Sequence, residues 1–144
     1  MVTKLKNSAG NYVTIQAGES CNLTGTLKDT GASTVTAPQT FTLTLYDEKT
    51  GAIINSRNGQ DVLNTNGGSV TSGAYTVELD SSDTAAVGDI EDGGTQNRIA
   101  RLEFTYDDGD SDRKGIEEFL FTVEKMKTAV GVGSGANEVT LTVT

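Results

Sequence analysis

Apolar and polar residues alternate along much of the chain, which places successive side chains on opposite faces of a strand. From Phe41 to Tyr46, phenylalanine and leucine alternate with threonine. The same alternation recurs in residues 75–79, 100–106, 119–123 and 139–144. Because one face of each segment would be buried and the other solvated, the pattern predicts antiparallel strands rather than parallel strands covered on both faces.

Two less regular segments, residues 12–15 and 21–27, predict further strands near the start of the chain. Twenty-two threonines suit the solvated face of a pleated sheet and disfavour helices. Turn sequences rich in Asp, Asn, Lys and Gly separate the segments, at residues 28–31, 47–51, 66–68 and 107–110. Strands at this spacing predict an all-β domain built as a β-sandwich.

Residues 81–88 form the one segment that favours a helix. Ser81 or Ser82 could cap it, Asp83 suits its first turn, and Gly88 could end it. We expect one or two turns that cross between the sheets and cover an open end of the sandwich.

The two ends of the sequence differ from its middle, because residues 131–136 have the composition of a flexible linker. The predicted layout is an N-terminal arm (1–11), a sandwich (12–126), a glycine-rich linker (127–137) and a final strand or arm (138–144). The final strand either folds back into its own sandwich or pairs with the sheet edge of a neighbouring subunit. We favour the neighbour, because the tether is longer than a hairpin requires, and expect Val139, Leu141 and Val143 at that interface.

The composition limits the chemistry open to this chain of 144 residues, a size typical of one domain. Without histidine, Ser-His-Asp triads, Cys-His pairs and imidazole metal ligands are excluded. With one cysteine, an intrachain disulfide and a CxxC motif are excluded as well. Cys21 lies on the apolar face of its segment with no basic neighbour, so we expect an inert core thiol.

The charge predicts which partners are disfavoured. Twenty acidic residues against eleven basic ones leave a net charge of -9, and the basic residues are dispersed, which argues against direct binding of nucleic acid. No apolar run approaches the roughly 20 residues that span a bilayer, and the first residues lack the hydrophobic core of a signal peptide. We therefore expect no membrane partner and synthesis in a cytoplasm.

One acidic cluster resembles the start of a calcium loop. Asp108, Asp110 and Asp112 follow the D-x-D-x-D spacing, and calcium binds oxygen ligands without histidine. The twelfth position counted from Asp108 is Phe119, where a calcium loop has a bidentate glutamate, and the flanking segments are predicted strands. We favour a solvated hairpin tip and keep calcium as the alternative.

The remaining candidates do not assemble into an active site. Glu117 and Glu118 are adjacent, so on a strand they point to opposite faces and cannot act together in glycoside hydrolysis. Tyr46, Tyr75 and Tyr106 would form a sugar platform only if exposed together, and the last two fall on apolar faces. We therefore expect a protein that is not an enzyme and has no cofactor.

Several segments resemble small immunoglobulin-like proteins of tailed bacteriophages, over about residues 12–125. The resemblance lies in residues 43–51, 54–57, 60–64, 75–79, 83–84, 98–106 and 118–123. It consists of strand and turn residues, so no functional residue is carried over. It implies an immunoglobulin-like antiparallel β-sandwich of about seven to nine strands with one short helix, and an accessory role in the virion.

The resemblance implies, as the leading expectation, a capsid decoration (cement) protein that binds the outer shell and bridges capsomers through its termini. Its partners would be the major capsid protein or other virion proteins, with self-association as a further option, and it would be located in the virion. A neck, tail or fibre-adaptor component is the alternative within the virion. A glycan-binding surface module is the alternative of another class, which the lack of Trp and the presence of only four Tyr disfavour.

Overall fold

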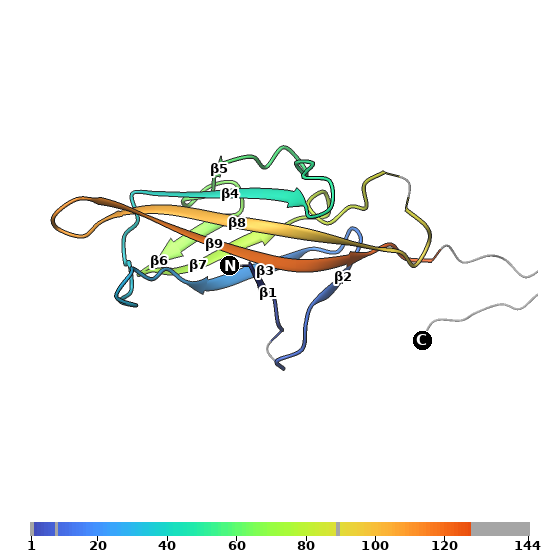
Figure 1. The fold of residues 1–144 in the computed structure, drawn as a ribbon, viewed down its shortest axis with the longest axis horizontal. Coiled ribbons are helices and arrows are strands. Elements are labelled where there is room, and N and C mark those ends of the chain that lie inside the picture. The colour runs from blue at the N-terminus through green and yellow to red at the C-terminus, as the bar shows by residue number, and fades with distance from the viewer. Residues whose placement is uncertain (1, 8, 89, 128–144) are drawn as a thin grey trace, which may run out of the picture.

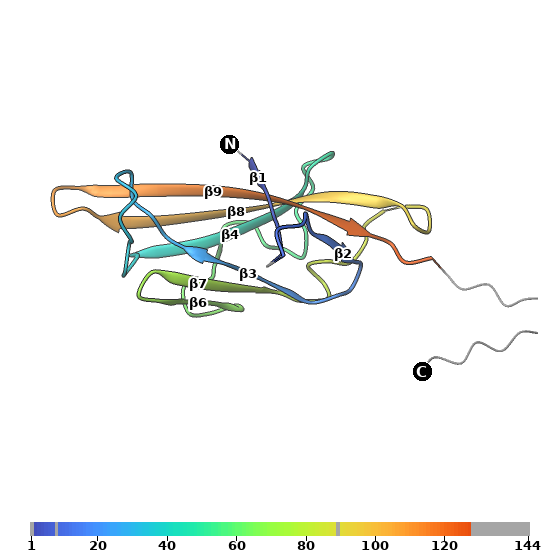
Figure 2. The same ribbon diagram turned by 90° about the horizontal axis from the view of Figure 1, so that it is seen from below.

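Two β-sheets pack face to face in the computed structural model, which describes residues 2–7, 9–88 and 90–127 (Figure 1, Figure 2). The large sheet has six strands in the order β1-β9-β8-β4-β5, and β2 also pairs with β9. Its strands are β1 (Val2–Lys4), β2 (Thr14–Gln16), β4 (Thr40–Asp47), β5 (Gln60–Asp61), β8 (Thr95–Asp107) and β9 (Asp112–Glu124). The small sheet has the order β3-β7-β6, from β3 (Cys21–Thr26), β7 (Ala74–Leu79) and β6 (Gly68–Thr71). The prediction of an all-β sandwich is confirmed.

The core fills the space between the two sheets with the apolar residues of the alternating segments. In β4, β7 and β8 every second residue, starting from Phe41, Tyr75 and Arg98, points inward and is buried. The side chains between them point to the outer face of each sheet, where most are partly exposed. The largest buried apolar side chains include Phe41, Phe104, Phe121, Leu43, Leu45, Leu79 and Leu102. Burying one such side chain contributes about 1.5–3 kcal/mol, so the period-two pattern is the main source of the fold's stability.

The longest element is the hairpin of β8 and β9, which pair over their full lengths from Thr95↔Glu124 to Asp107↔Asp112. Its turn projects past the small sheet in both views (Figure 1, Figure 2). Near that end, Phe104 lies opposite Gly115 and its ring covers the space where a Cβ on Gly115 would be. A glycine at this position therefore lets an aromatic ring of the core pack against the neighbouring strand.

Residues near the N-terminus belong to the large sheet. β1 and β2 both pair with β9 in parallel, with Val2 opposite Glu118 and Ile15 opposite Val123. Residues 2–4, which the sequence assigned to an arm, are thus hydrogen-bonded to the sheet of their own chain. The linker beyond residue 127 and the final strand, with Val139, Leu141 and Val143, lie outside the described residues.

The prediction of a short helix at residues 81–88 is wrong, because the part of this segment that the structure describes forms turns. The carboxylate of Asp80 accepts hydrogen bonds from the backbone N–H groups of Ser82 and Asp83, at 2.9 and 3.1 Å. These local bonds satisfy the backbone in a turn and compete with a helix. Asp83, expected in the first turn of that helix, is instead fully buried. In the described ranges, no helix is long and apolar enough to cross a membrane.

Replacing Gly115 with alanine will lower the stability of the sandwich. The added Cβ would overlap the ring of Phe104, which is 2% exposed and held in the core. Overpacking of this kind costs about 1–3 kcal/mol, to be measured by urea unfolding. Gly31→Ala is the matched control, because its Cβ would meet only Asp29 Oδ1 at 3.5 Å, an ordinary contact. Equal unfolding midpoints for the two variants would contradict the packing described here.

Candidate interaction surface

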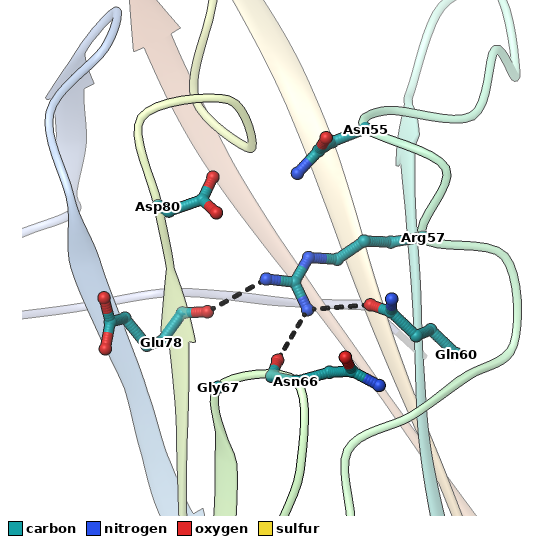
Figure 3. A pocket seen from close by; sticks show the side chains of 7 residues that line it. All are labelled: Asn55, Arg57, Gln60, Asn66, Gly67, Glu78 and Asp80. Carbon is teal, nitrogen blue, oxygen red and sulfur yellow. Dashed lines mark hydrogen bonds between the residues drawn. The ribbon is translucent and has the colours of Figure 1, made fainter.

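A polar pocket of about 410 Å³ opens between the β4–β5 loop and the adjoining ends of β6 and β7 (Figure 3). Its lining consists of Asn55, Arg57, Gln60, Asn66, Gly67, Glu78 and Asp80. In Figure 3 the side chain of Arg57 extends from the β4–β5 loop across the pocket toward β7. Whether this pocket is a binding site depends on how many of the Arg57 donors remain free for a ligand.

Arg57 uses all five of its N–H donors inside the protein. Nε and Nη2 donate to the two carboxylate oxygens of Asp83, at 2.7 and 2.8 Å. Nη2 also donates to the carbonyl oxygen of Glu78 at 3.3 Å, and Nη1 donates to Gln60 Oε1 and to the carbonyl oxygen of Asn66, both at 3.0 Å. The pocket therefore has a structural arginine at its base and no cationic donor to offer an anion.

Asp83 is the other half of this ion pair and is fully buried. It also accepts hydrogen bonds from Asn55 Nδ2 at 2.9 Å and from the backbone N–H of Asp80 at 2.8 Å. Burial alone would raise the pKa of Asp83, but the hydrogen bonds from Arg57, Asn55 and Asp80 and the charge on Arg57 outweigh burial and lower it. The pair connects the β4–β5 loop of the large sheet to the turn after β7 of the small sheet.

A second arginine, Arg98 of β8, is also excluded from solvent. Its Nη2 donates to the carbonyl oxygen of Ala85 at 2.9 Å and to Gln96 Oε1 at 2.8 Å, and its Nη1 donates to the carbonyl oxygen of Asp83 at 3.4 Å. Its Nε has no hydrogen-bond partner among the described residues. Burial lowers the pKa of Arg98, and the nearby charge of Asp47 opposes this effect. Two arginines thus hold the 83–85 segment.

The aspartates of the candidate calcium loop lie in the β8–β9 turn and its first paired residues, and Asp108 and Asp112 are hydrogen-bonded to other side chains. Asp108 Oδ2 accepts a 2.7 Å hydrogen bond from Arg113 Nε, and Asp108 Oδ1 accepts from the backbone N–H groups of Asp110 and Ser111. The bond from Arg113 and those from the backbone hold the pKa of Asp108 well below its usual range. Asp112 accepts a hydrogen bond from Gln39 at 3.3 Å. In the part of the chain that the structure describes, no three acidic or cysteine side chains could hold a metal ion.

Glu117 and Glu118 point to opposite faces of β9, as the sequence predicts. Glu117 points inward and accepts a hydrogen bond from the Tyr75 hydroxyl at 3.3 Å, and burial raises its pKa while this bond opposes the shift. Glu118 lies on the outer face of the sheet, where it accepts from the Tyr46 hydroxyl at 3.1 Å and from Arg101 at 3.3 Å. The two carboxylates cannot act on one substrate.

Three further residues considered in the sequence analysis, Tyr75, Tyr106 and Cys21, are wholly or partly buried. Tyr75 and Tyr106 are buried in the core, which confirms the prediction and removes them from any exposed aromatic platform. Cys21 is half-buried, and burial followed by the charges of Glu19 and Asp83 raises the pKa of its thiol to about 11. Cys21 is therefore a protonated thiol at neutral pH, as expected of an inert cysteine.

The outer face of the large sheet carries three exposed aliphatic side chains that the sequence analysis missed. Val2, Ile53 and Ile116 are 43%, 41% and 55% exposed. The strand register places Val2 opposite Glu118, Ile53 opposite Tyr46 and Ile116 opposite Glu103, so all three share this face. We call these three residues, with Tyr46, Arg101, Glu118 and Leu120, the outer patch.

The centre of the outer patch is ordered by polar contacts. The guanidinium of Arg101 lies 5.4 Å from the centre of the Tyr46 ring, and both side chains bond to Glu118. An ordered aromatic–arginine–carboxylate group with exposed aliphatic side chains around it has the composition of a protein–protein interface. The signal was present in the sequence, since Leu120 between Phe119 and Phe121 breaks the alternation and makes β9 apolar on both faces.

No protein-family model, curated protein or solved structure matches this chain. The geometry of the described residues therefore carries the functional argument, with the outer patch as the candidate site.

Replacing Asp83 with asparagine will destabilise the protein by about 3–5 kcal/mol at pH 7, because it leaves the buried Arg57 charge unpaired. The pKa of Asp83 is lower in the folded state than its unfolded value of about 4. The contribution of the Asp83 charge to the free energy of unfolding is therefore complete above about pH 4 and is lost as the pH falls through the folded-state pKa. The stability gap between wild type and D83N should narrow in acid, as measured by urea unfolding across pH.

The matched control for D83N is D108N, since Asp108 forms an ion pair with Arg113 at the same 2.7 Å separation but on the surface. We expect little change in the unfolding free energy for D108N, because exposed pairs are screened by water and salt. Similar losses in both variants would contradict the structural role assigned to Arg57 and Asp83.

Calcium should leave the melting temperature unchanged, because the carboxylate of Asp108 is already bonded to Arg113 and to backbone N–H groups. The measurement compares melting curves in millimolar calcium and in excess chelator. A rise in melting temperature with calcium would show that the β8–β9 turn rearranges to bind the ion.

Proposed function

We propose that this chain is a non-catalytic structural protein of a virion, and specifically a capsid decoration protein that binds the outer shell and bridges neighbouring capsomers through its termini. The virion setting comes from the resemblance to small immunoglobulin-like phage proteins. The observation that carries the binding role is the outer patch, where three exposed aliphatic side chains share one sheet face with the ordered group of Tyr46, Arg101 and Glu118.

The strand order supports the immunoglobulin-like part of the proposal. In that fold one sheet contains strands in the order B-E-D and packs against a second sheet with the order G-F-C. Here the sheet β3-β7-β6 faces the sheet β9-β8-β4-β5. If β3 is taken as strand B and the letters follow the chain, the first sheet has the order B-E-D and the second begins with the order G-F-C. The outer patch then lies on the G-F-C face.

The charge distribution fits a protein exposed on a particle. The net charge of -9 belongs mainly to side chains at turns and on solvated strand faces, whereas Asp83, which is fully buried, is neutralised by Arg57. A surface of one sign keeps particles apart in solution. Many copies that each make a modest contact would stabilise a shell by multivalency.

Replacing Ile116 with aspartate should weaken binding to capsids assembled without this protein. Ile116 is exposed, so the fold should persist, whereas a charge in an apolar contact opposes docking. The measurement is occupancy after co-sedimentation, with Ser69→Asp on the small sheet as the matched control because Ser69 is also exposed.

Cryo-EM of particles saturated with the wild-type protein would separate the two virion roles. A copy number close to that of the major capsid protein supports decoration. A few copies restricted to one vertex would instead support the neck, tail or fibre-adaptor alternative. Wild-type protein that binds no capsid or tail structure would overturn the proposal.

A further inference from the structure

Among the residues that the structure describes, no strand pairs with the outer edge of β3 in the small sheet. β3 pairs only with β7 among the described strands, through Cys21↔Leu79 to Thr26↔Ala74. The N–H of Leu27, the residue after β3, donates to the carbonyl oxygen of Gly73 on the β7 side. Because the direction of the backbone groups alternates along an antiparallel strand, those of Asn22, Thr24 and Thr26 point away from β7. All three residues are exposed. This edge therefore offers three N–H and three C=O groups to an additional strand.

The opposite edge of the same sheet is less available. At β6, the N–H of Val70 donates to the side chain of Asn64 at 3.0 Å, so the preceding loop already occupies part of that edge. In the large sheet, β5 and the loop beside it cover the edge of β4. The N–H of Val62 donates to the carbonyl oxygen of Phe41, and the N–H of Leu45 donates to the carbonyl oxygen of Arg57. Of these edges, β3 is the one whose outward backbone N–H and C=O groups, those of Asn22, Thr24 and Thr26, all belong to exposed residues.

An apolar slot lies directly beside the open edge. A cavity of about 100 Å³ is lined by Leu5, Lys6, Val13 and Ile15 from the β1–β2 side and by Cys21, Asn22, Leu23 and Thr24 from β3. The apolar slot is the part of this cavity formed by Leu5, Val13, Ile15, Cys21 and Leu23. Leu5, Val13 and Cys21 pack against the core but are only partly buried. A strand added to β3 would direct every second side chain into this slot, where an aliphatic residue would complete the core.

Residues 139–144 of this chain have the properties that such a strand needs. In an extended conformation Val139, Leu141 and Val143 would share one face and the threonines the other, and the six residues equal β3 in number. β9 ends beside the entry to β3, since the N–H of Ala17 donates to the carbonyl oxygen of Glu124 at 2.8 Å. Residues 128–138 extend to about 36 Å at most, and β3 is about 20 Å long, so the tether can reach either end of the edge.

We propose that residues 139–144 bind the β3 edge as an antiparallel strand, with Leu141 opposite Leu23 and its side chain in the apolar slot. In dilute protein the segment occupies the edge of its own chain, because the tether gives it a high effective concentration there. When copies are crowded, the same segment occupies the β3 edge of a neighbour and links the two sandwiches. The pairing involves two parts of one sequence, so it does not depend on the virion role.

The test is a disulfide between the segment and the edge, in a Cys21→Ser background that removes the native thiol. The proposed register places residue 142 opposite residue 22, with Cα atoms about 5.5 Å apart, which a disulfide can span. Asn22→Cys with Thr142→Cys should therefore oxidise to an intrachain disulfide in dilute protein. Non-reducing gels should show a rising share of linked dimers as the protein concentration is increased.

The matched control pairs Thr142→Cys with Ser69→Cys, which places the second thiol on the exposed β6 edge of the same sheet. Oxidation at residue 22 should be about tenfold faster or more, because pairing rather than random collision brings the thiols together. Adding Leu141→Asp to the 22/142 variant should slow the reaction, since the charge would enter the apolar slot. Circular dichroism checks that every variant keeps the β-sandwich.

Three outcomes would overturn the proposal. The first is an equal rate of disulfide formation in the 22/142 and 69/142 variants. The second is no disulfide at residue 22 at any protein concentration, and the third is a rate of disulfide formation in the 22/142 variant that Leu141→Asp leaves unchanged. The result is independent of capsid binding, so a failure here leaves the proposed virion function to its own test.

Discussion

The ion pair of Arg57 and Asp83 is the interaction on which the arrangement of the two sheets depends. Each side chain comes from a connecting segment of a different sheet, and both are removed from water. Burying two charges is costly, and here the cost is offset by a bidentate contact and by further hydrogen bonds to every remaining guanidinium donor. Arg98 holds the same segment from β8, so the turn after β7 is held by two arginines.

The acidic residues near the core each have a hydrogen-bond partner within the protein. Asp83 is bound to Arg57, and Glu117 accepts a hydrogen bond from Tyr75. Asp47 accepts hydrogen bonds from the backbone and side chain of Thr50 in its own turn. Each carboxylate stabilises a local connection. A catalytic carboxylate would instead face an open space together with a second reactive group.

The two sheets expose different kinds of surface. The large sheet presents a face, the outer patch, where aliphatic side chains surround Tyr46, Arg101 and Glu118. The small sheet presents an edge, where the backbone of β3 faces solvent beside an apolar slot. Side-chain contacts suit the docking of a folded partner, whereas open backbone groups suit an extended segment. Together they give the sandwich two separate modes of association.

Much of the architecture could be predicted from the sequence, because period-two alternation in segments such as Phe41–Tyr46 is a local property that commits one face to the core. The same reasoning placed Glu117 and Glu118 on opposite faces and Tyr75 and Tyr106 inside. It failed where distant residues compete for one group. Asp83 suits the first turn of a helix on local grounds, yet Arg57, 26 positions away, turns it inward.

The sequence by itself determined the all-β class, the buried faces of the main strands and the exclusion of histidine chemistry and of an intrachain disulfide. Only the tertiary structure decided that Val2, Ile53 and Ile116 lie on one face of the large sheet, that Asp108 is bound by Arg113, and that β3 is left with an open edge. These features depend on which strands become neighbours. Strand pairing is set by the free energy of the whole core, which no single segment encodes.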